Sequence, residues 1–133
     1  MIVDIAERGR PLIVSGVESR LSQVFLNVIA NAVSFSPSDG EIRVRAAHDG
    51  RAVLVTVEDQ GPGIPEDKLT AIFDRFYSER PAGEKFGTHS GLGLSISKQI
   101  VEAHRGRIWA ENRTDATGVV SGARFSIRLP AQS

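Results

Sequence analysis

The chain has 133 residues, of which 41% are hydrophobic and 24% are charged, and its sixteen basic side chains balance sixteen acidic ones. This length indicates one domain with its own core, and a neutral domain has no general electrostatic reason to bind nucleic acid or an anionic membrane. The absence of cysteine excludes disulfides and cysteine-ligated metal sites and suits a reducing compartment. Because the sequence also lacks a signal peptide and any apolar run of the ~20 residues that a membrane span needs, we expect a cytoplasmic domain that contacts neither nucleic acid nor membrane.

The apolar pattern predicts helices and strands in mixed order. In chain order we expect a short strand at 11–14, a helix at 19–32 capped by Ser19, strands at 41–47 and 52–57, a helix at 65–76, a mobile loop at 78–90, a helix at 91–105 and strands at 107–112 and 123–129. This order favours an α+β fold, an α/β sandwich in which a mixed sheet carries its helices on one face.

The first predicted helix carries a polar stripe beside its apolar face. At ~100° per residue, Gln23, Asn27 and Asn31 fall within about 80° of one another. These amides either bridge to neighbouring backbone or point their oxygens into a cleft. A side-chain amide oxygen is a suitable ligand for Mg²⁺, which takes few protein ligands and keeps several waters.

A second polar signal follows the strand predicted at 52–57. Asp59 sits at the end of that strand, and Gly61 and Gly63 come directly after it. The aspartate either belongs to a simple turn or accepts a hydrogen bond from a donor such as the exocyclic amine of a purine. Glycines at this place would let a planar ring lie against the backbone.

The third signal opens the helix predicted at 91–105. Ser90, Gly91, Leu92 and Gly93 would present free backbone N–H groups at the positive end of the helix dipole. Such a helix start binds anions, although the sequence has neither a Walker P-loop nor a dinucleotide fingerprint. Amides for a metal, an acid for adenine and N–H groups for phosphates together predict a nucleotide site.

Five stretches in this order resemble one family. LSQVFLNVIANAVSFSP, VEDQGPGIP, IFDRFY and GLGLSISKQIVEAHRGRIWAEN are similar to the N, G1, F and G2 boxes of the ATP-binding catalytic domain of sensor histidine kinases, and GARFSIRLP resembles the strand after the G3 glycine. The resemblance covers residues 10–130 and implies the Bergerat fold shared with gyrase B, Hsp90 and MutL. FYSERPAGEKFGTHSGLGLSISKQI is most similar to alphaproteobacterial sensor kinases of the ChvG/ExoS type.

The resemblance implies a role for each box. Asn31, supported by Asn27, would ligate the Mg²⁺ on the ATP phosphates, and Asp59 would accept from the adenine amine. Residues 78–90 would form a lid, while Phe73 and Phe76 would either contact a partner helix bundle or simply pack in the core. The predicted ATP site comprises Asn27, Asn31, Phe35, Asp59, Gly61, Gly63, Ile64, Tyr77, Arg80, Lys85, Ser90, Gly91, Leu92, Gly93 and Leu94.

The chain also departs from the family pattern. Ser34 and Ser78 stand where the family often has lysine and arginine, and Ala123 replaces a common threonine. Arg75, Arg80 or Lys85 could compensate, so we expect ATP to bind with modest affinity. Position 27 carries an amide where the ATPases of the superfamily have a glutamate that activates water, and an amide cannot act as a general base. This favours a kinase over an ATPase.

The phosphoacceptor that the family requires is not found in the sequence. His48, His89 and His104 are the only histidines, none lies in the acceptor motif, and we expect ordinary surface residues. The acceptor would then belong to a dimerising helical domain of the same kinase, with MIVDIAERG, residues 1–9, as the tail of the connection. A response regulator would act downstream, and the parent protein would be anchored in the inner membrane. The alternative is a regulatory nucleotide-binding module, such as a degenerate kinase or an anti-sigma-type switch, that transfers no phosphate.

Overall fold

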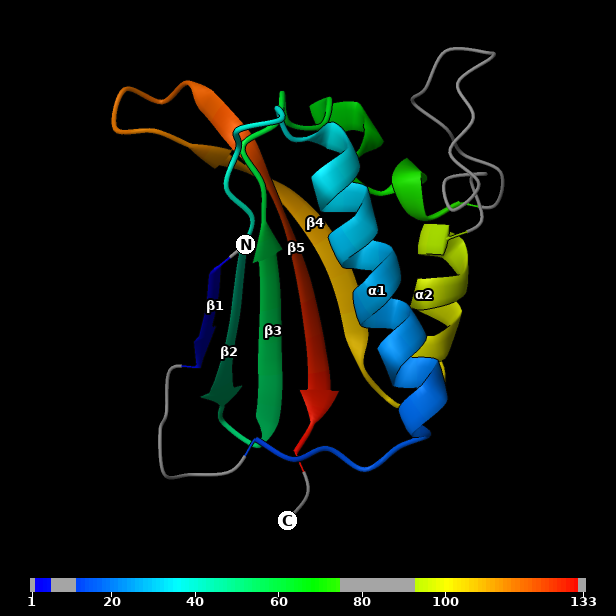
Figure 1. The fold of residues 1–133 in the computed structure, drawn as a ribbon. Coiled ribbons are helices and arrows are strands. Elements are labelled where there is room, and N and C mark those ends of the chain that lie inside the picture. Colours follow the sequence, from blue (N-terminus) through cyan, green and yellow to red (C-terminus); the bar gives the residue numbers. More distant parts are fainter. Residues whose placement is uncertain (1, 6–11, 75–92, 132–133) are drawn as a thin grey trace.

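A computed structural model describes residues 2–5, 12–74 and 93–131 of the chain (Figure 1). Five strands form one sheet in the order β1-β2-β3-β5-β4, in which β1 is parallel to β2 and the other neighbours are antiparallel. The elements are β1 (Ile2–Ile5), α1 (Glu18–Phe35), β2 (Arg43–Asp49), β3 (Ala52–Glu58), the single 3₁₀ turns η1 (Glu66–Lys68) and η2 (Ala71–Phe73), α2 (Gly93–Ala103), β4 (Arg107–Thr114) and β5 (Val120–Pro130).

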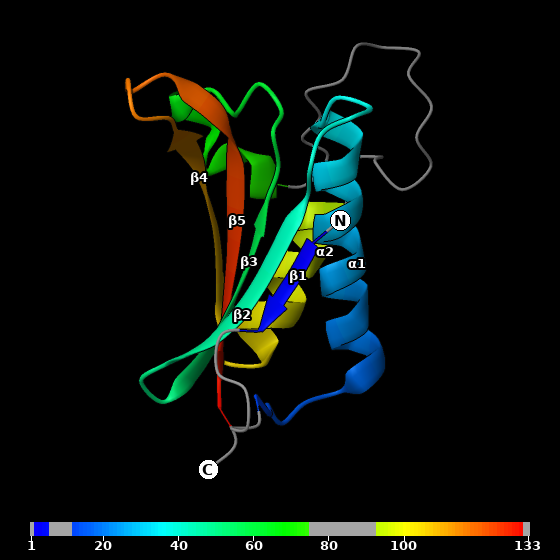
Figure 2. The same ribbon diagram turned by 60° about the vertical axis from the view of Figure 1, so that its left-hand side comes forward.

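Both long helices lie on the same face of the sheet, as two views of the ribbon show (Figures 1 and 2). The core between the layers is formed by the apolar stripe of α1 and by alternate residues of the central strands. Its most deeply buried members include Val24, Val28, Val57, Phe125 and Ile127. No described helix covers the opposite face, where the other residues of each strand point. The predicted mixed α/β sandwich is therefore confirmed.

The first helix is longer than the sequence indicated and begins differently. Its N-cap is Val17 rather than Ser19, without a side-chain cap, and at the other end the N–H of Ser36 donates to the carbonyl oxygen of Ala32. Pro37 follows, and a residue before proline is pushed out of the helical region. The helix α1 therefore ends at Phe35, and its last turn lies beside the loop that follows β3.

The prediction of one helix at 65–76 was wrong. The chain forms the separate turns η1 and η2, and Asp74 leaves η2 with an extended ψ of 151°. The apolar spacing that suggested a helix needs only one turn to bury Ile72 and Phe73, which are 6% and 7% exposed. Phe73 stacks edge-on against Phe125, with ring centroids 6.2 Å apart, so it is a core residue. Phe76 lies outside the described residues.

The two ends of the sheet also differ from the sequence prediction. The expected strand at 11–14 is reduced to an isolated bridge between Val14 and Ala131. Conversely, Ile2–Ile5 lie within the tail expected at 1–9 and pair with β2 as an edge strand. A four-residue edge strand is too short to give a recognisable alternation, which explains why it was missed. None of the helices in the described ranges is long and apolar enough to cross a membrane.

His104 is not the ordinary surface residue that was expected. Its Nδ1 donates to the carbonyl oxygen of Ile100 at 2.8 Å, and its Nε2 accepts the N–H of Val17 at 3.1 Å. The ring therefore joins the end of α2 to the residue that begins α1. Gly16 makes this possible, because a side chain there would collide with the imidazole.

Candidate nucleotide site

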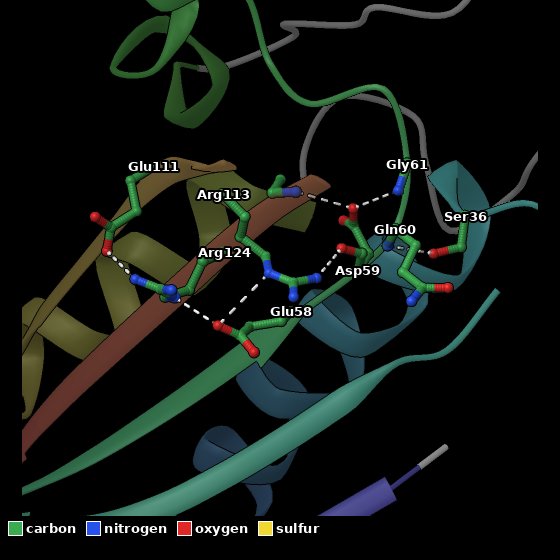
Figure 3. Close-up of polar contacts among 9 residues, drawn as sticks. Ser36, Glu58, Asp59, Gln60, Gly61, Glu111, Arg113 and Arg124 are labelled. Atoms are coloured by element: carbon green, nitrogen blue, oxygen red, sulfur yellow. Dashed lines mark hydrogen bonds and ion pairs between the residues drawn. The ribbon is translucent and has the colours of Figure 1, made fainter. Parts of the chain in front are cut away.

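Asp59 is a buried carboxylate with one oxygen fixed by the backbone (Figure 3). It is 3% exposed, and its Oδ1 accepts the N–H of Gly61 at 2.9 Å and that of Ala123 at 3.0 Å. Its own N–H donates to the carbonyl oxygen of Ala123 at 3.0 Å. Oδ2 has no donor among the residues that the structure describes. The fold therefore leaves one carboxylate oxygen of fixed direction for an external hydrogen-bond donor.

The glycines after Asp59 allow the loop to approach the end of α1. A Cβ on Gly61 would lie 2.5 Å from the carbonyl oxygen of Phe35, which is closer than real atoms approach. The Oγ of Ser36 accepts the N–H of Gln60 at 3.3 Å, so the last turn of α1 and this loop are also bonded. Gly63 has φ 81°, a conformation that glycine adopts without strain. Of the predicted residues, Gly61 thus contacts both Asp59 and Phe35, while Gly63 lies against Asn112 and Val120.

Asn112, which no pattern in the sequence singles out, holds the next residue of the loop. Its Oδ1 accepts the N–H of Ile64 and its Nδ2 donates to the carbonyl oxygen of Ile64, both at 2.7 Å. This paired contact imitates a strand ladder and ties the loop to β4. A side chain on Gly63 would strike Asn112. Ile64 then packs against the core, so the loop is held on both sides.

Asn27 joins the polar stripe of α1 to the start of α2. Its Nδ2 donates to the carbonyl oxygen of Gly93 and to the Oγ of Ser97, both at 3.3 Å. A carbonyl oxygen can only accept, so the amide nitrogen must face α2 and Oδ1 must face elsewhere. Ser97 is completely buried and also donates to Gly93 at 2.8 Å. For Asn27 the nitrogen therefore bridges to neighbouring backbone, which was one of the two predicted alternatives, and Oδ1 has no partner among the described residues.

Asn31 lies one helical turn beyond Asn27 and one turn before Phe35 on the same face of α1. Residues four apart in a helix have their Cβ atoms about 6 Å from each other. It is half-buried, and its amide has no hydrogen-bond partner among the described residues. Ser34 continues the stripe, and its buried Oγ is likewise without a partner in the described part of the chain. No cluster of three or more acidic or histidine ligands exists in the described ranges, so a metal here would depend on amides and ligand oxygens.

The start of α2 is only partly described. Gly93 is the first residue of α2 within the described ranges, and Leu94 packs partly against the core. The first-turn N–H groups of a helix have no partner within it and form its positive end. Of the other predicted site residues, Tyr77, Arg80, Lys85, Ser90, Gly91 and Leu92 lie outside the described residues, as does the lid expected at 78–90.

The helix α2 and the loop after β3 therefore both contact α1. Asn27 contacts α2 at Gly93, and the end of α1 contacts the loop at Gly61. Between these contacts lies Asn31, whose polar group is uncommitted in the described structure. This arrangement offers an acceptor at one end, amide oxygens in the middle and a positive helix end at the other.

Comparison with known sequences decides the family. The profile described as "Histidine kinase-, DNA gyrase B-, and HSP90-like ATPase" matches residues 16–133. The chain belongs to this family. Membership in the histidine kinase-, gyrase B- and HSP90-like ATPases confirms the resemblance carried by the sequence boxes, and the family description implies ATP as the nucleotide.

Individual relatives within the family are sensor kinases. The sensor protein ChvG of Agrobacterium fabrum is 52% identical over 120 residues, which are 90% of this chain and 20% of that protein. The mycobacterial sensor histidine kinase MprB superimposes with a TM-score of 0.81 at 33% identity, covering 98% of this chain and 80% of that one. Full-length ShkA in complex with AMPPNP gives a TM-score of 0.75 at 28% identity, covering 99% of this chain and 26% of that one. The chain thus spans a fifth of the length of ChvG.

Proposed function

We propose that this domain binds Mg²⁺-ATP between α1, the loop after β3 and the start of α2. We further propose that it donates the γ-phosphoryl group to a histidine on a separate helical domain of the same sensor kinase. The observation that carries the proposal is the buried carboxylate of Asp59, with Oδ1 engaged by two backbone N–H groups and Oδ2 open. A pocket with one charged acceptor of fixed direction selects a ligand that presents a donor there.

Adenine fits this acceptor because its 6-amino group is a donor. The close approach of the loop to α1, which requires Gly61, holds the acceptor against the end of α1. Asn112 fixes Ile64 in the same loop, where its side chain would pack against the ring. The relative ShkA, whose structure holds AMPPNP, supports an adenine nucleotide as the ligand.

The phosphates would extend along α1 toward α2. Asn31 and the Oδ1 of Asn27 would hold Mg²⁺, and the first-turn N–H groups from Gly93 onward would bind phosphate oxygens. When bound, Mg²⁺ neutralises the charge that develops on the phosphates during transfer. The chain itself contributes position: Asn27, tied to Gly93, keeps the metal ligand and the phosphate-binding helix end at a constant separation.

The identity of position 27 favours transfer to a protein over transfer to water. Its amide cannot take a proton from water, and its nitrogen is already committed to Gly93 and Ser97. In the transfer, the bond from the γ-phosphorus to the bridging oxygen breaks, a bond to the imidazole nitrogen forms, and ADP leaves. His104 is bonded through both ring nitrogens to the helices, so it is not the acceptor.

The acceptor and the later steps would lie in the rest of the parent protein. This chain covers a fifth of its ChvG relative, and the remaining length leaves room for a dimerising phosphoacceptor domain and a membrane anchor. We propose a cytoplasmic place for the domain, with residues 1–9 leading from the acceptor domain and a response regulator downstream.

Phosphotransfer to an added acceptor tests this function. The protein is mixed with the isolated histidine-bearing domain of its parent kinase, Mg²⁺ and γ-labelled ATP, and label on the acceptor is measured. We expect labelling by the wild-type protein and by Asp49→Asn, a control substitution at the far end of the sheet. We expect none with Asn31→Ala. Nucleotide binding without any labelling would instead support a regulatory switch, and absence of binding would refute both readings.

A further inference from the structure

A guanidinium from the uncovered face of the sheet holds the backbone of Asp59. Arg113 on β4 donates from Nη1 to the carbonyl oxygen of Asp59 at 2.8 Å, and its Nε lies 3.7 Å from Oε2 of Glu58 (Figure 3). We propose that Arg113 is a positioning residue for the nucleotide base, which fixes the Asp59 peptide and through it the direction of the open carboxylate oxygen. This inference rests on the proposed function, because it concerns the same adenine pocket.

The strand register explains how Arg113 reaches Asp59. Arg113 is paired with Gly122 on β5, and Gly122 presents no side chain on the uncovered face. A Cβ on Gly122 would collide with the carbonyl oxygen of Asp59, so that glycine is also what allows β5 and Asp59 to lie together. The guanidinium of Arg113 therefore passes over Gly122 of β5, a position where any side chain would collide with Asp59. This close fit is difficult to explain as a surface arginine that happens to lie nearby.

Glu58 keeps the guanidinium in place. Its carboxylate is 12% exposed and accepts a 2.7 Å hydrogen bond from Nε of Arg124, its partner in the strand register. Arg124 also lies 3.4 Å from Glu111, and the hydrogen bond with Glu58 raises the pKa of the Arg124 guanidinium. Two arginines and two glutamates thus form a neutral row across three strands. Because Arg124 fixes the carboxylate of Glu58, the ion pair between Glu58 and Arg113 limits the positions that the Arg113 guanidinium can adopt.

With Arg113 in place, Asp59 has only one uncommitted polar atom in the described structure. Its N–H, its carbonyl oxygen and its Oδ1 are all bonded, and Oδ2 remains. The carbonyl of Asp59 belongs to the peptide that leads to Gly61, whose N–H orients the carboxylate. Without Arg113 that peptide keeps only the 3.3 Å hydrogen bond from the N–H of Gln60 to Oγ of Ser36, so the peptide moves more and the Gly61 contact with Oδ1 loosens. The effect falls on the base pocket and not on α1 or α2, so base selectivity should change more than phosphate binding.

Calorimetric titrations with ADP and with purine riboside diphosphate, which lacks the 6-amino group, test the inference. We expect Arg113→Ala to raise the Kd for ADP about fivefold, the loss that one hydrogen bond of ordinary strength gives, and to change the Kd for the analogue less than about twofold. Arg113→Lys, which keeps a donor, should recover part of the selectivity. Arg128→Ala is the matched control, since Arg128 lies on the same face and bonds Asp49 at 3.1 Å.

Amide hydrogen exchange without nucleotide is the second readout. In Arg113→Ala, exchange at Gly61 should be faster by about tenfold than in wild type or Arg128→Ala, because its bond to Oδ1 opens more often. Equal losses for both nucleotides with unchanged exchange at Gly61 would overturn the positioning role and leave nucleotide binding intact. A wild-type protein that binds neither nucleotide would overturn the proposed function, and the role of Arg113 in adenine selection with it.

Discussion

The substitution Asp59→Asn changes one atom that the structure identifies. Two backbone N–H groups, of Gly61 and Ala123, point at Oδ1, and an N–H can bond only to an acceptor. The asparagine oxygen must therefore occupy the Oδ1 position, and its NH₂ group must replace Oδ2. The variant keeps the internal hydrogen bonds of the loop while its outward group changes from a charged acceptor to a donor.

The cost follows from what faces that group. In the wild-type protein the 6-amino group of adenine would donate to a carboxylate, which contributes about 1.5–3 kcal/mol, and in the variant two donors would face each other. We expect a total loss of about 2–4 kcal/mol, a rise of about 30- to 1,000-fold in the Kd for ADP. A purine without the 6-amino group has no such bond to lose, and its Kd should change less than about threefold.

Calorimetry with three nucleotides measures this pattern. Inosine diphosphate carries an oxygen at position 6, so it should bind Asp59→Asn more tightly than it binds the wild-type protein. The control Asp49→Asn also removes one carboxylate charge, but at the end of β2, far from Asp59. It should bind all three nucleotides as the wild-type protein does. Thermal unfolding should show that Asp59→Asn shifts Tm by less than about 4 °C. Losses of equal size for ADP and the 6-unsubstituted purine would refute the assignment of Asp59 to adenine.

Three further substitutions test other parts of the account. Asn31→Ala should abolish Mg²⁺-dependent nucleotide binding without changing the circular dichroism spectrum, and calorimetry that found the same affinity with and without the side chain would remove its metal role. Gly122→Ala forces a methyl group against the carbonyl of Asp59, so urea unfolding should give a loss of about 1–3 kcal/mol and an unchanged stability would be inconsistent with this close approach. His104→Ala removes the hydrogen bonds to Val17 and Ile100. We expect a loss of about 1–2 kcal/mol in the free energy of unfolding and an unchanged Kd for ADP. A changed Kd would show that His104 also acts on the nucleotide site.

The sequence predicted most reliably what depends on a single element. The buried face of α1 repeats with the helical period, and this repeat is the physical cause of both the prediction and the packing of Val24 and Val28. The strands β3 and β5 were predicted from a nearly continuous apolar run at 52–57 and from apolar alternation at 123–129, which likewise reflect their own burial. The turns η1 and η2 were not, because an apolar spacing of three and four residues is equally satisfied by a continuous helix and by two short turns that bury the same side chains.

The candidate site divides in the same way. Asp59 and the glycines of its loop could be singled out because they directly follow a buried strand, although only the other two signals and the family resemblance favoured a binding site over a simple turn. Asn112 and Arg113 could not, since each is a polar residue on an edge strand whose importance depends on the register between β4 and β5. That register follows from the pairing of whole strands and leaves no local pattern around either residue.

Nuclear magnetic resonance titration of the labelled protein with Mg²⁺ and a non-hydrolysable ATP analogue tests the central claim most directly. We predict that the side-chain amides of Asn27 and Asn31 and the backbone amides of Gly61 and Gly93 shift together, with one common Kd, and that withholding Mg²⁺ removes the changes at the two asparagines first. Changes confined to one of these three places, or separate affinities for them, would contradict a single nucleotide bound across α1, the loop after β3 and α2.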